Sequence, residues 1–137
     1  APLPLPMADD SLEFSFSGVK TAALRALRGR EGDEAFRRDL AASLQHVVAT
    51  VLVRKLMRAA AAVRPATIIV TGGVAANSVL RETVTAACRR DGFALVIPPP
   101  ALCTDNAAMI AAAGHRRLAA GERSGLNLSA YSDLPLV

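Results

Sequence analysis

The longest run of helical periodicity lies in the first half of the chain. Between positions 34 and 63, apolar side chains recur every three or four residues, which predicts one buried face of a long helix. A polar, glycine-containing loop at residues 28–33 precedes it, and Pro65 ends it. The apolar positions of the expected face are Phe36, Leu40, Leu44, Val47, Val48, Val51, Leu52 and Leu56.

Three short segments have the pattern of β-strands. Residues 14–18 alternate Phe with Ser, which is typical of a half-buried strand that ends at Gly18 before a helix at 21–27. Residues 67–71 form a β-branched apolar run, which predicts a fully buried parallel strand. Residues 94–97 predict the next buried strand, and the three prolines that follow prevent its continuation.

Two further helices are predicted between and after these strands. The first covers residues 78–90 and closes at Asp91-Gly92. The second runs over residues 104–120, with Thr104 or Asp105 as its N-cap.

Strands that alternate with helices predict an α/β fold with a small, mostly parallel sheet and flanking helices. Three strands are few for a free-standing sheet of this class. We therefore expect further strands to come from upstream sequence or from a partner.

Composition sets broad limits on function. The 137 residues suffice for one domain, and 52% apolar content excludes intrinsic disorder. Aromatic residues make up only 4% of the chain, which disfavours a base-stacking platform. The net charge of +4 is scattered along the chain, so it fits an ordinary solvated surface as well as contact with a polyanion.

No feature of the sequence indicates secretion or a membrane. Cys88 and Cys103 have neither zinc-site nor disulfide spacing, which fits a reducing cytoplasm. No signal peptide pattern opens the chain, and charged side chains within residues 40–63 argue against a membrane span. The first residue is not Met and a Pro-rich start leads directly into core-like sequence, so we expect a piece of a longer, soluble chain.

The turn after the 67–71 strand is the first candidate site. Gly72 and Gly73 would let a ligand approach the backbone at a helix start, so a nucleotide is one interpretation and a tight packing turn is the other. Asn77 is likewise either an N-cap or an amide that contacts a ribose or purine edge.

Asp105 is the second candidate, as a helix cap or as a metal ligand. One carboxylate cannot hold a metal alone, and neither His46 nor His115 has a partner at metal-ligand spacing. No catalytic residue can be assigned from residue type and spacing.

Three segments resemble the C-terminal half of the TsaD family, the tRNA threonylcarbamoyladenosine transferases formerly called O-sialoglycoprotein endopeptidases. They are FSFSGVKT at residues 14–21, GGVAANSVLR at 72–81 and PPPALCTDNAAMIA at 98–111, in the family's order. With the Pro/Leu start and the ending at residues 131–136, the resemblance covers nearly the whole chain. It implies that residues 1–137 form part of the second lobe of an actin-like ATPase fold.

The resemblance also implies a reaction. Family members transfer a threonylcarbamoyl group from threonylcarbamoyl-AMP to the adenosine next to the anticodon of tRNAs that read ANN codons. A paralogous subunit and a small ATPase are the expected partners, beside tRNA, in the cytoplasm.

Site residues are carried over only where the motifs match. Asn77 corresponds to the asparagine that contacts the adenylate, Gly72 and Gly73 to the adenosine-side glycines, and Asp105 to the aspartate that completes an iron site with two histidines. Those histidines and the phosphate-side loop lie upstream in the family, so this chain alone is expected to be inactive.

The resemblance also predicts how the last helix packs, and it allows an alternative function. In the parent, residues 104–120 are expected to pack toward the first lobe, and without that lobe the chain is expected to self-associate or its helix to fray. The alternative function is a non-catalytic paralog that acts as a scaffolding or dimerisation module. An ATP-dependent kinase of the same superfold would share the glycine turn but not the other two motifs.

Overall fold

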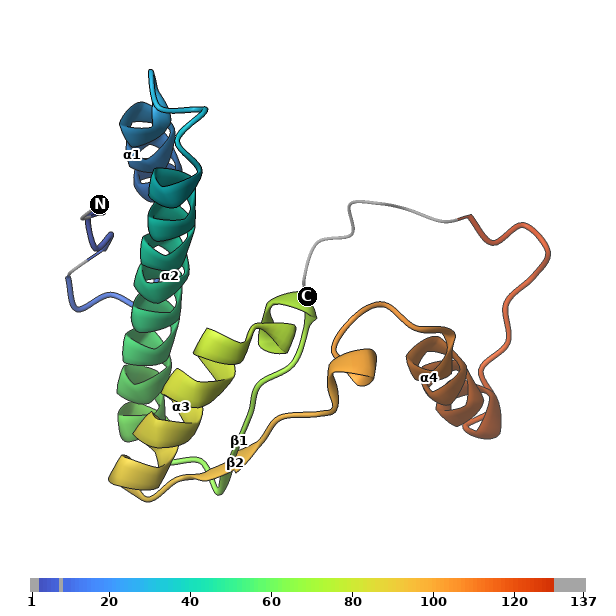
Figure 1. The fold of residues 1–137 in the computed structure, drawn as a ribbon. Coiled ribbons are helices and arrows are strands. Elements are labelled where there is room, and N and C mark those ends of the chain that lie inside the picture. The colour runs from blue at the N-terminus through green and yellow to red at the C-terminus, as the bar shows by residue number, and fades with distance from the viewer. Residues whose placement is uncertain (1–2, 8, 130–137) are drawn as a thin grey trace. The chain divides into compact units, whose positions relative to one another are not determined.

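The computed structural model describes residues 3–7 and 9–129 and has the expected α/β organisation (Figure 1). The chain divides into two compact units, residues 1–104 and 105–137, and each is treated by itself. The resemblance of residues 131–136 falls outside the described residues. The elements are α1 (Ser17–Leu27), α2 (Glu34–Val63), β1 (Thr67–Ile69), the 3-10 turn η1 (Gly73–Ala76), α3 (Ser78–Asp91), β2 (Ala94–Val96), the 3-10 turn η2 (Pro100–Leu102) and α4 (Ala107–Ala119).

Local signals set both ends of α2. The Asp33 side chain accepts a hydrogen bond from the Phe36 amide at 3.0 Å, which satisfies a free N–H of the first turn. Arg64 then takes a left-handed conformation, and Pro65 prevents continuation. The bounds predicted for this helix are therefore confirmed.

The burial of α2 differs from the single face that was predicted. One row of buried side chains along α2 packs in the main core against Ile68 of β1 and against α3; it consists of Ala49, Val53, Met57 and Ala60. A second row, Val47, Val51 and Lys55, is also buried but lies outside that cluster. The predicted face included Val47 and Val51 of the second row but none of the first row, because α2 is covered from two sides.

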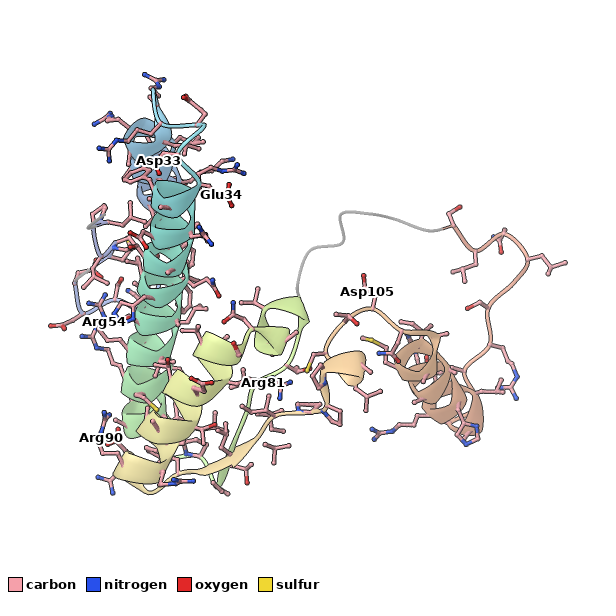
Figure 2. The ribbon with its side chains drawn as sticks, viewed as in Figure 1. Asp33, Glu34, Arg54, Arg81, Arg90 and Asp105 are labelled. Carbon is pink, nitrogen blue, oxygen red and sulfur yellow. The ribbon has the colours of Figure 1, made fainter. Side chains whose placement is uncertain are left out.

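Lys55 belongs to the second row and is held by the N-terminal segment. Its ammonium donates to Asp9 Oδ1 at 3.3 Å, to Ser11 Oγ at 3.2 Å and to the Ser11 carbonyl at 2.7 Å. Arg54, which is labelled in Figure 2, and Arg58 also donate to backbone carbonyls of this segment. Three cations within about one helical turn, at positions 54, 55 and 58, thus attach residues 6–7 and 9–11 to α2.

Among the described helices, α2 alone is long and apolar enough to cross a membrane by length and composition. Core helices of soluble proteins pass the same test, so this is weak evidence. The basic side chains of α2 that were expected to oppose a span form hydrogen bonds and ion pairs with residues 6–7 and 9–11.

Strands β1 and β2 pair in parallel, with Thr67 opposite Ala94 and Ile69 opposite Val96, as expected for a βαβ unit. The expectation that both strands are buried is wrong, since no residue of β2 is buried and β1 is buried at one position only. Ile68 is buried, whereas Ile69 remains 66% exposed. The reason is that helical side chains cover only the face on which Ile68 lies.

The strand predicted at residues 14–18 is also wrong. Residues 11–16 are not in a ladder, and α1 begins at Ser17. Alternation of Phe14 and Ser15 suits a strand, but a strand forms only where a neighbouring backbone supplies hydrogen bonds. No backbone of the described residues pairs with this segment.

The last predicted helix forms over a shorter range, and neither expected residue caps it. Asn106 is the N-cap of α4, and its side-chain oxygen accepts from the Met109 amide at 3.0 Å. Thr104 and Asp105 precede the cap because the chain first turns helical after Asn106. None of the described residues of α4 is buried.

Candidate functional site

The glycine turn, Gly72-Gly73, connects β1 to α3, and its shape depends on the backbone conformation of Gly72. Gly72 has φ 95°, which side-chain-bearing residues rarely adopt. Its carbonyl accepts from the Ala75 amide at 2.9 Å, so the chain turns into η1 immediately after the strand. Glycine at position 72 is therefore explained by the conformation of the turn.

The conformation of the turn does not explain why position 73 is a glycine. Its φ is not in the left-handed region, and a Cβ added there would have no atom within 4 Å. Packing of the described residues therefore does not require glycine at this position. The absence of a side chain leaves the backbone at the start of η1 exposed.

Asn77 is the N-cap of α3, which confirms one of the two roles predicted for it from the sequence. Its Oδ1 accepts from the Leu80 amide at 3.1 Å, and its Nδ2 donates to Gln45 Oε1 of α2 at 3.0 Å. A carboxamide has two N–H donors and two acceptor lone pairs, so one of each is still available. The cap role therefore leaves Asn77 able to contact a ligand as well.

Arg81 is a structural residue of this region that the sequence did not single out, and it is labelled in Figure 2. Its Nε donates to the Ala75 carbonyl at 2.6 Å, and its Nη2 donates to the Pro98 carbonyl at 2.7 Å. Nη2 also lies 3.5 Å from the sulfur of the buried Cys103. Arg81 thus ties the glycine turn to the loop at residues 98–103.

The signal for Arg81 was present in the sequence. It lies four residues after the N-cap Asn77, and so one helical turn farther along the same side of α3. What the sequence could not show is that the loop after β2 returns to this side.

Asp105 belongs to the second unit, whereas Gly72, Gly73 and Asn77 share one strand–turn–helix of the first. Its carboxylate is exposed and makes no hydrogen bond or ion pair with any described residue. Within residues 3–7 and 9–129, no group of three His, Cys, Asp or Glu side chains is placed to hold a metal ion. Asp105 can therefore supply one carboxylate ligand, but no complete metal site is present among the described residues.

Comparison with known proteins gives one consistent family. A sequence profile of the family described as "TsaD: tRNA N6-adenosine threonylcarbamoyltransferase" matches residues 1–112. A protein of that name from Sorangium cellulosum is 53% identical over 122 residues, which are 88% of this chain and 34% of the relative. The relative from Symbiobacterium thermophilum is 48% identical over 137 residues, 98% of this chain and 40% of its own length.

A third relative, from Clostridium botulinum, is 46% identical over 130 residues, which are 93% of this chain and 38% of the relative. The chain thus spans a little over one third of the length of the curated relatives that it matches. The family match includes all three motifs and all four site residues that the sequence singled out. This chain belongs to the TsaD family of tRNA N6-adenosine threonylcarbamoyltransferases.

Proposed function

We propose that this chain supplies the adenosine-side turn and one metal ligand of a tRNA threonylcarbamoyladenosine transferase. The whole enzyme would transfer the threonylcarbamoyl group from threonylcarbamoyl-AMP to the adenosine next to the anticodon of tRNAs that read ANN codons. The observation that carries this proposal is the family match over residues 1–112, which contain Gly72, Gly73, Asn77 and Asp105.

The geometry of the glycine turn supports the role proposed for its residues. The open space at Gly73 allows a ribose or purine to approach the backbone without displacing a side chain. The free N–H and lone pair of Asn77 can donate to and accept from ribose hydroxyls. Because Asn77 is held by both Leu80 and Gln45, its amide is oriented before the ligand binds.

The chemistry of Asp105 fits a divalent metal such as iron, for which carboxylate oxygen is a suitable ligand. Its exposed carboxylate is not used in capping α4, since Asn106 does that. When bound, the metal would polarise the threonylcarbamoyl group and help to orient it. The other ligands would come from outside this chain.

The reaction itself is an acyl transfer. The N6 amine of adenosine attacks the carbonyl carbon of the threonylcarbamoyl group, the new C–N bond forms and the bond from that carbon to the AMP phosphate oxygen breaks, so AMP leaves as the phosphate anion and the amine releases one proton. Residues of this chain would act by positioning the AMP portion, because holding two reactants in register removes much of the entropic cost. The proposed partners are tRNA, a paralogous subunit and a small ATPase, in the cytoplasm.

A chimeric enzyme tests the proposal. This chain replaces the matching 122-residue segment of the Sorangium cellulosum relative, and threonylcarbamoyladenosine is measured in tRNA that reads an ANN codon. We expect the chimera to modify the tRNA and the 137-residue chain alone to be inactive and to retain no stoichiometric iron after desalting. Asp105→Ala should lower metal content and activity together.

Asp39→Ala is the matched control, because Asp39 is an exposed aspartate on α2 that is distant in sequence from the residues of both candidate sites. It should leave metal content and activity unchanged. Normal metal content in the Asp105→Ala chimera would remove Asp105 from the metal site. A folded chimera that binds tRNA but never modifies it would favour the scaffolding alternative.

A further inference from the structure

Gln45 is an exposed residue of α2 to which neither its type nor its spacing in the sequence assigns a role. In the folded chain its Oε1 accepts a hydrogen bond from Asn77 Nδ2 at 3.0 Å, although the two residues are 32 positions apart. This bond joins the candidate ligand residue of the glycine turn to a different element of the first unit.

The backbone of α3 determines how both amides are oriented. The Leu80 N–H can only donate, so the Asn77 atom that lies 3.1 Å from it must be the carbonyl oxygen. The Asn77 nitrogen then faces Gln45, and the Gln45 atom that it contacts must be an acceptor oxygen. Exchange of oxygen and nitrogen in either amide would place two donors or two acceptors against each other. The pair therefore has one orientation in which both hydrogen bonds form.

The second hydrogen bond restricts a rotation that the first leaves open. The χ2 torsion of asparagine has a broad energy minimum, so the bond to Leu80 alone would allow the plane of the Asn77 carboxamide to tilt. The bond to Gln45 holds the opposite side of the same plane. The remaining N–H and the remaining lone pair of Asn77 consequently point in fixed directions.

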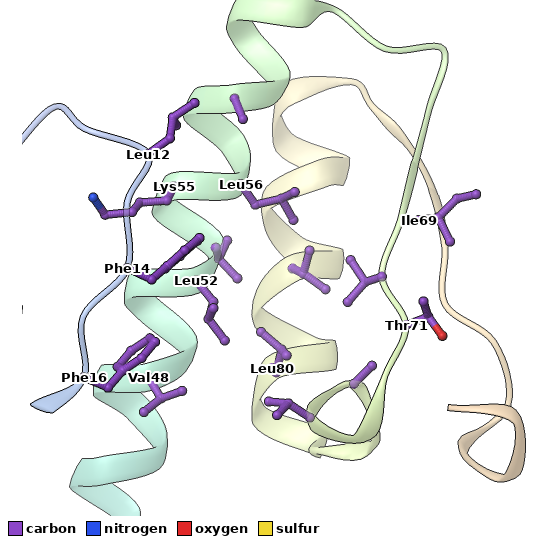
Figure 3. Close-up of a pocket in the computed structure, with 16 residues that line it drawn as sticks. Leu12, Phe14, Phe16, Val48, Leu52, Lys55, Leu56, Ile69, Thr71 and Leu80 are labelled. Atoms are coloured by element: carbon purple, nitrogen blue, oxygen red, sulfur yellow. The ribbon is translucent and has the colours of Figure 1, made fainter. Parts of the chain in front are cut away.

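The two amides lie beside an apolar hollow of about 220 Å³ between α2 and the start of α3. The described residues that line it include no charged side chain and no polar side chain other than the two amides. Val48, Leu52 and Leu80 also line the larger apolar pocket drawn in Figure 3. A hydrogen bond beside apolar groups is stronger than one in bulk water, so these surroundings favour the bond between Gln45 and Asn77. The hollow is lined by Leu44, Gln45, Val48, Ala49, Leu52, Val74, Asn77 and Leu80.

We propose that Gln45 is a positioning residue of the adenosine-side site, whose carbonyl oxygen orients the Asn77 carboxamide toward the ribose or purine of the adenylate. Gln45 acts through Asn77 and contacts no reacting atom. The inference rests on the proposed function, because Gln45 has this role only if Asn77 contacts the adenylate. It follows that position 45 requires an acceptor oxygen of suitable reach, which glutamate also supplies and methionine does not.

The test uses the chimeric enzyme and measures the inhibition constant of AMP together with KM and kcat for threonylcarbamoyl-AMP. Gln45→Met removes the acceptor at nearly constant length, and it should raise the inhibition constant and KM by about fivefold to tenfold with kcat changed by less than about twofold. Gln45→Glu keeps an acceptor and should stay within about threefold of the wild type. His46→Ala is the matched control, because His46 is the next residue of α2 and is also exposed, and it should change none of the three constants.

A double-mutant cycle distinguishes failure of this inference from failure of the proposed function. Gln45→Met should have no further effect in an Asn77→Ala background, because the group that it positions is then absent. An Asn77→Ala variant with unchanged AMP inhibition would remove Asn77 from the adenylate site and overturn both. If Asn77→Ala weakens AMP but Gln45→Met does not, or if Gln45→Met acts equally in both backgrounds, only the positioning role is wrong.

A second measurement needs neither the chimera nor a ligand. In the 137-residue chain, nitrogen relaxation of the Asn77 side-chain amide should report a group about as rigid as the backbone of α3. Gln45→Met should make that amide more mobile, and Gln45→Glu should leave it rigid. An Asn77 amide that is equally mobile in the wild type and in Gln45→Met would overturn the proposal.

Discussion

Helices α3 and α4 begin in the same way and end in different surroundings. Each starts with an asparagine whose side-chain oxygen accepts from the amide three residues later, at 3.1 Å for Asn77 and 3.0 Å for Asn106. Yet α3 buries residues such as Leu80 and Val84, whereas no described residue of α4 is buried. A capped, amphipathic sequence is thus enough to form a helix, but the helix is buried only where another element covers it.

The largest expected difference between α3 and α4 is the loss of stability when a charge is placed on the apolar side of each helix. Val84→Asp would bury an unpaired carboxylate at a site with no exposure, so it should cost about 4 kcal/mol or more and unfold the first unit. Ile110→Asp on α4 starts from a side chain that is 68% exposed, and it should change stability by less than about 0.5 kcal/mol. Urea titration followed by circular dichroism compares the two. A similar loss in both variants would mean that α4 is buried in solution.

Hydrogen exchange tests the same contrast without substitution. Amides of α4 should exchange at least about tenfold faster than those of β1, because a helix with no buried side chains opens locally. Sedimentation of the same sample reports self-association through Met109, Ile110 and Leu118, which are all more than half exposed. A monomer in which residues 107–118 are protected as strongly as residues 67–71 would contradict the expected weakness of α4.

Removal of the N-cap side chain from each helix should give a smaller difference in stability. Asn77→Ala removes the cap and the bond to Gln45, and it should lower the free energy of unfolding of the first unit by about 1–2 kcal/mol. Asn106→Ala should fray α4 and leave the urea midpoint of the first unit unchanged. Asn77→Asp is the control for the cap, because it keeps the cap acceptor, with an added negative charge that suits a helix N-terminus, and loses the donor to Gln45. If Asn77→Asp were as destabilising as Asn77→Ala, the hydrogen bond to Gln45 would contribute more to stability than the cap does.

The smallest expected effect is a pH dependence confined to the first unit. The hydrogen bond from the Ser11 hydroxyl, with help from Lys55, holds the pKa of Asp9 below its ordinary value of 3.8. A pKa that is lower in the folded state contributes stability above pH 3.8, and that contribution is lost as pH falls through the lowered value. The α4 unit has no corresponding long-range pair among its described residues, since Arg117 and Glu122 are neighbours in sequence.

Acid titration of the wild type against Asp9→Asn isolates this contribution. The stability difference between the two proteins should shrink below pH 3.8 and be constant between pH 5 and 7, where Asp9 is ionised. Release of residues 9–11 can be followed by hydrogen exchange at the same pH values. A difference that does not change with pH would show that the Asp9 charge adds nothing to the attachment of this segment.

Some of the site depends on features that local sequence already contained. The glycine pair, the Asn77 cap and the family motifs were readable because each is a short, contiguous pattern. Arg81 was missed because two of its three acceptors lie in a loop 17 and 22 residues farther along the chain. The choice of Asn106 over Thr104 or Asp105 as the cap was also unreadable, since all three residue types can cap a helix.

The sequence by itself determined the helices and the parallel pair of strands. Asp33 and Pro65 bound α2, and Asn77 and Gly92 bound α3, because capping and chain-breaking act within a few residues. Only the tertiary structure decided which surfaces are covered. The burial of Lys55 depends on Asp9 and Ser11, more than 40 residues earlier, and the exposure of Ile69 on the lack of a covering element. Residues 14–16 follow the same rule: a helix makes its hydrogen bonds within itself, whereas a strand needs a neighbour that local sequence does not specify.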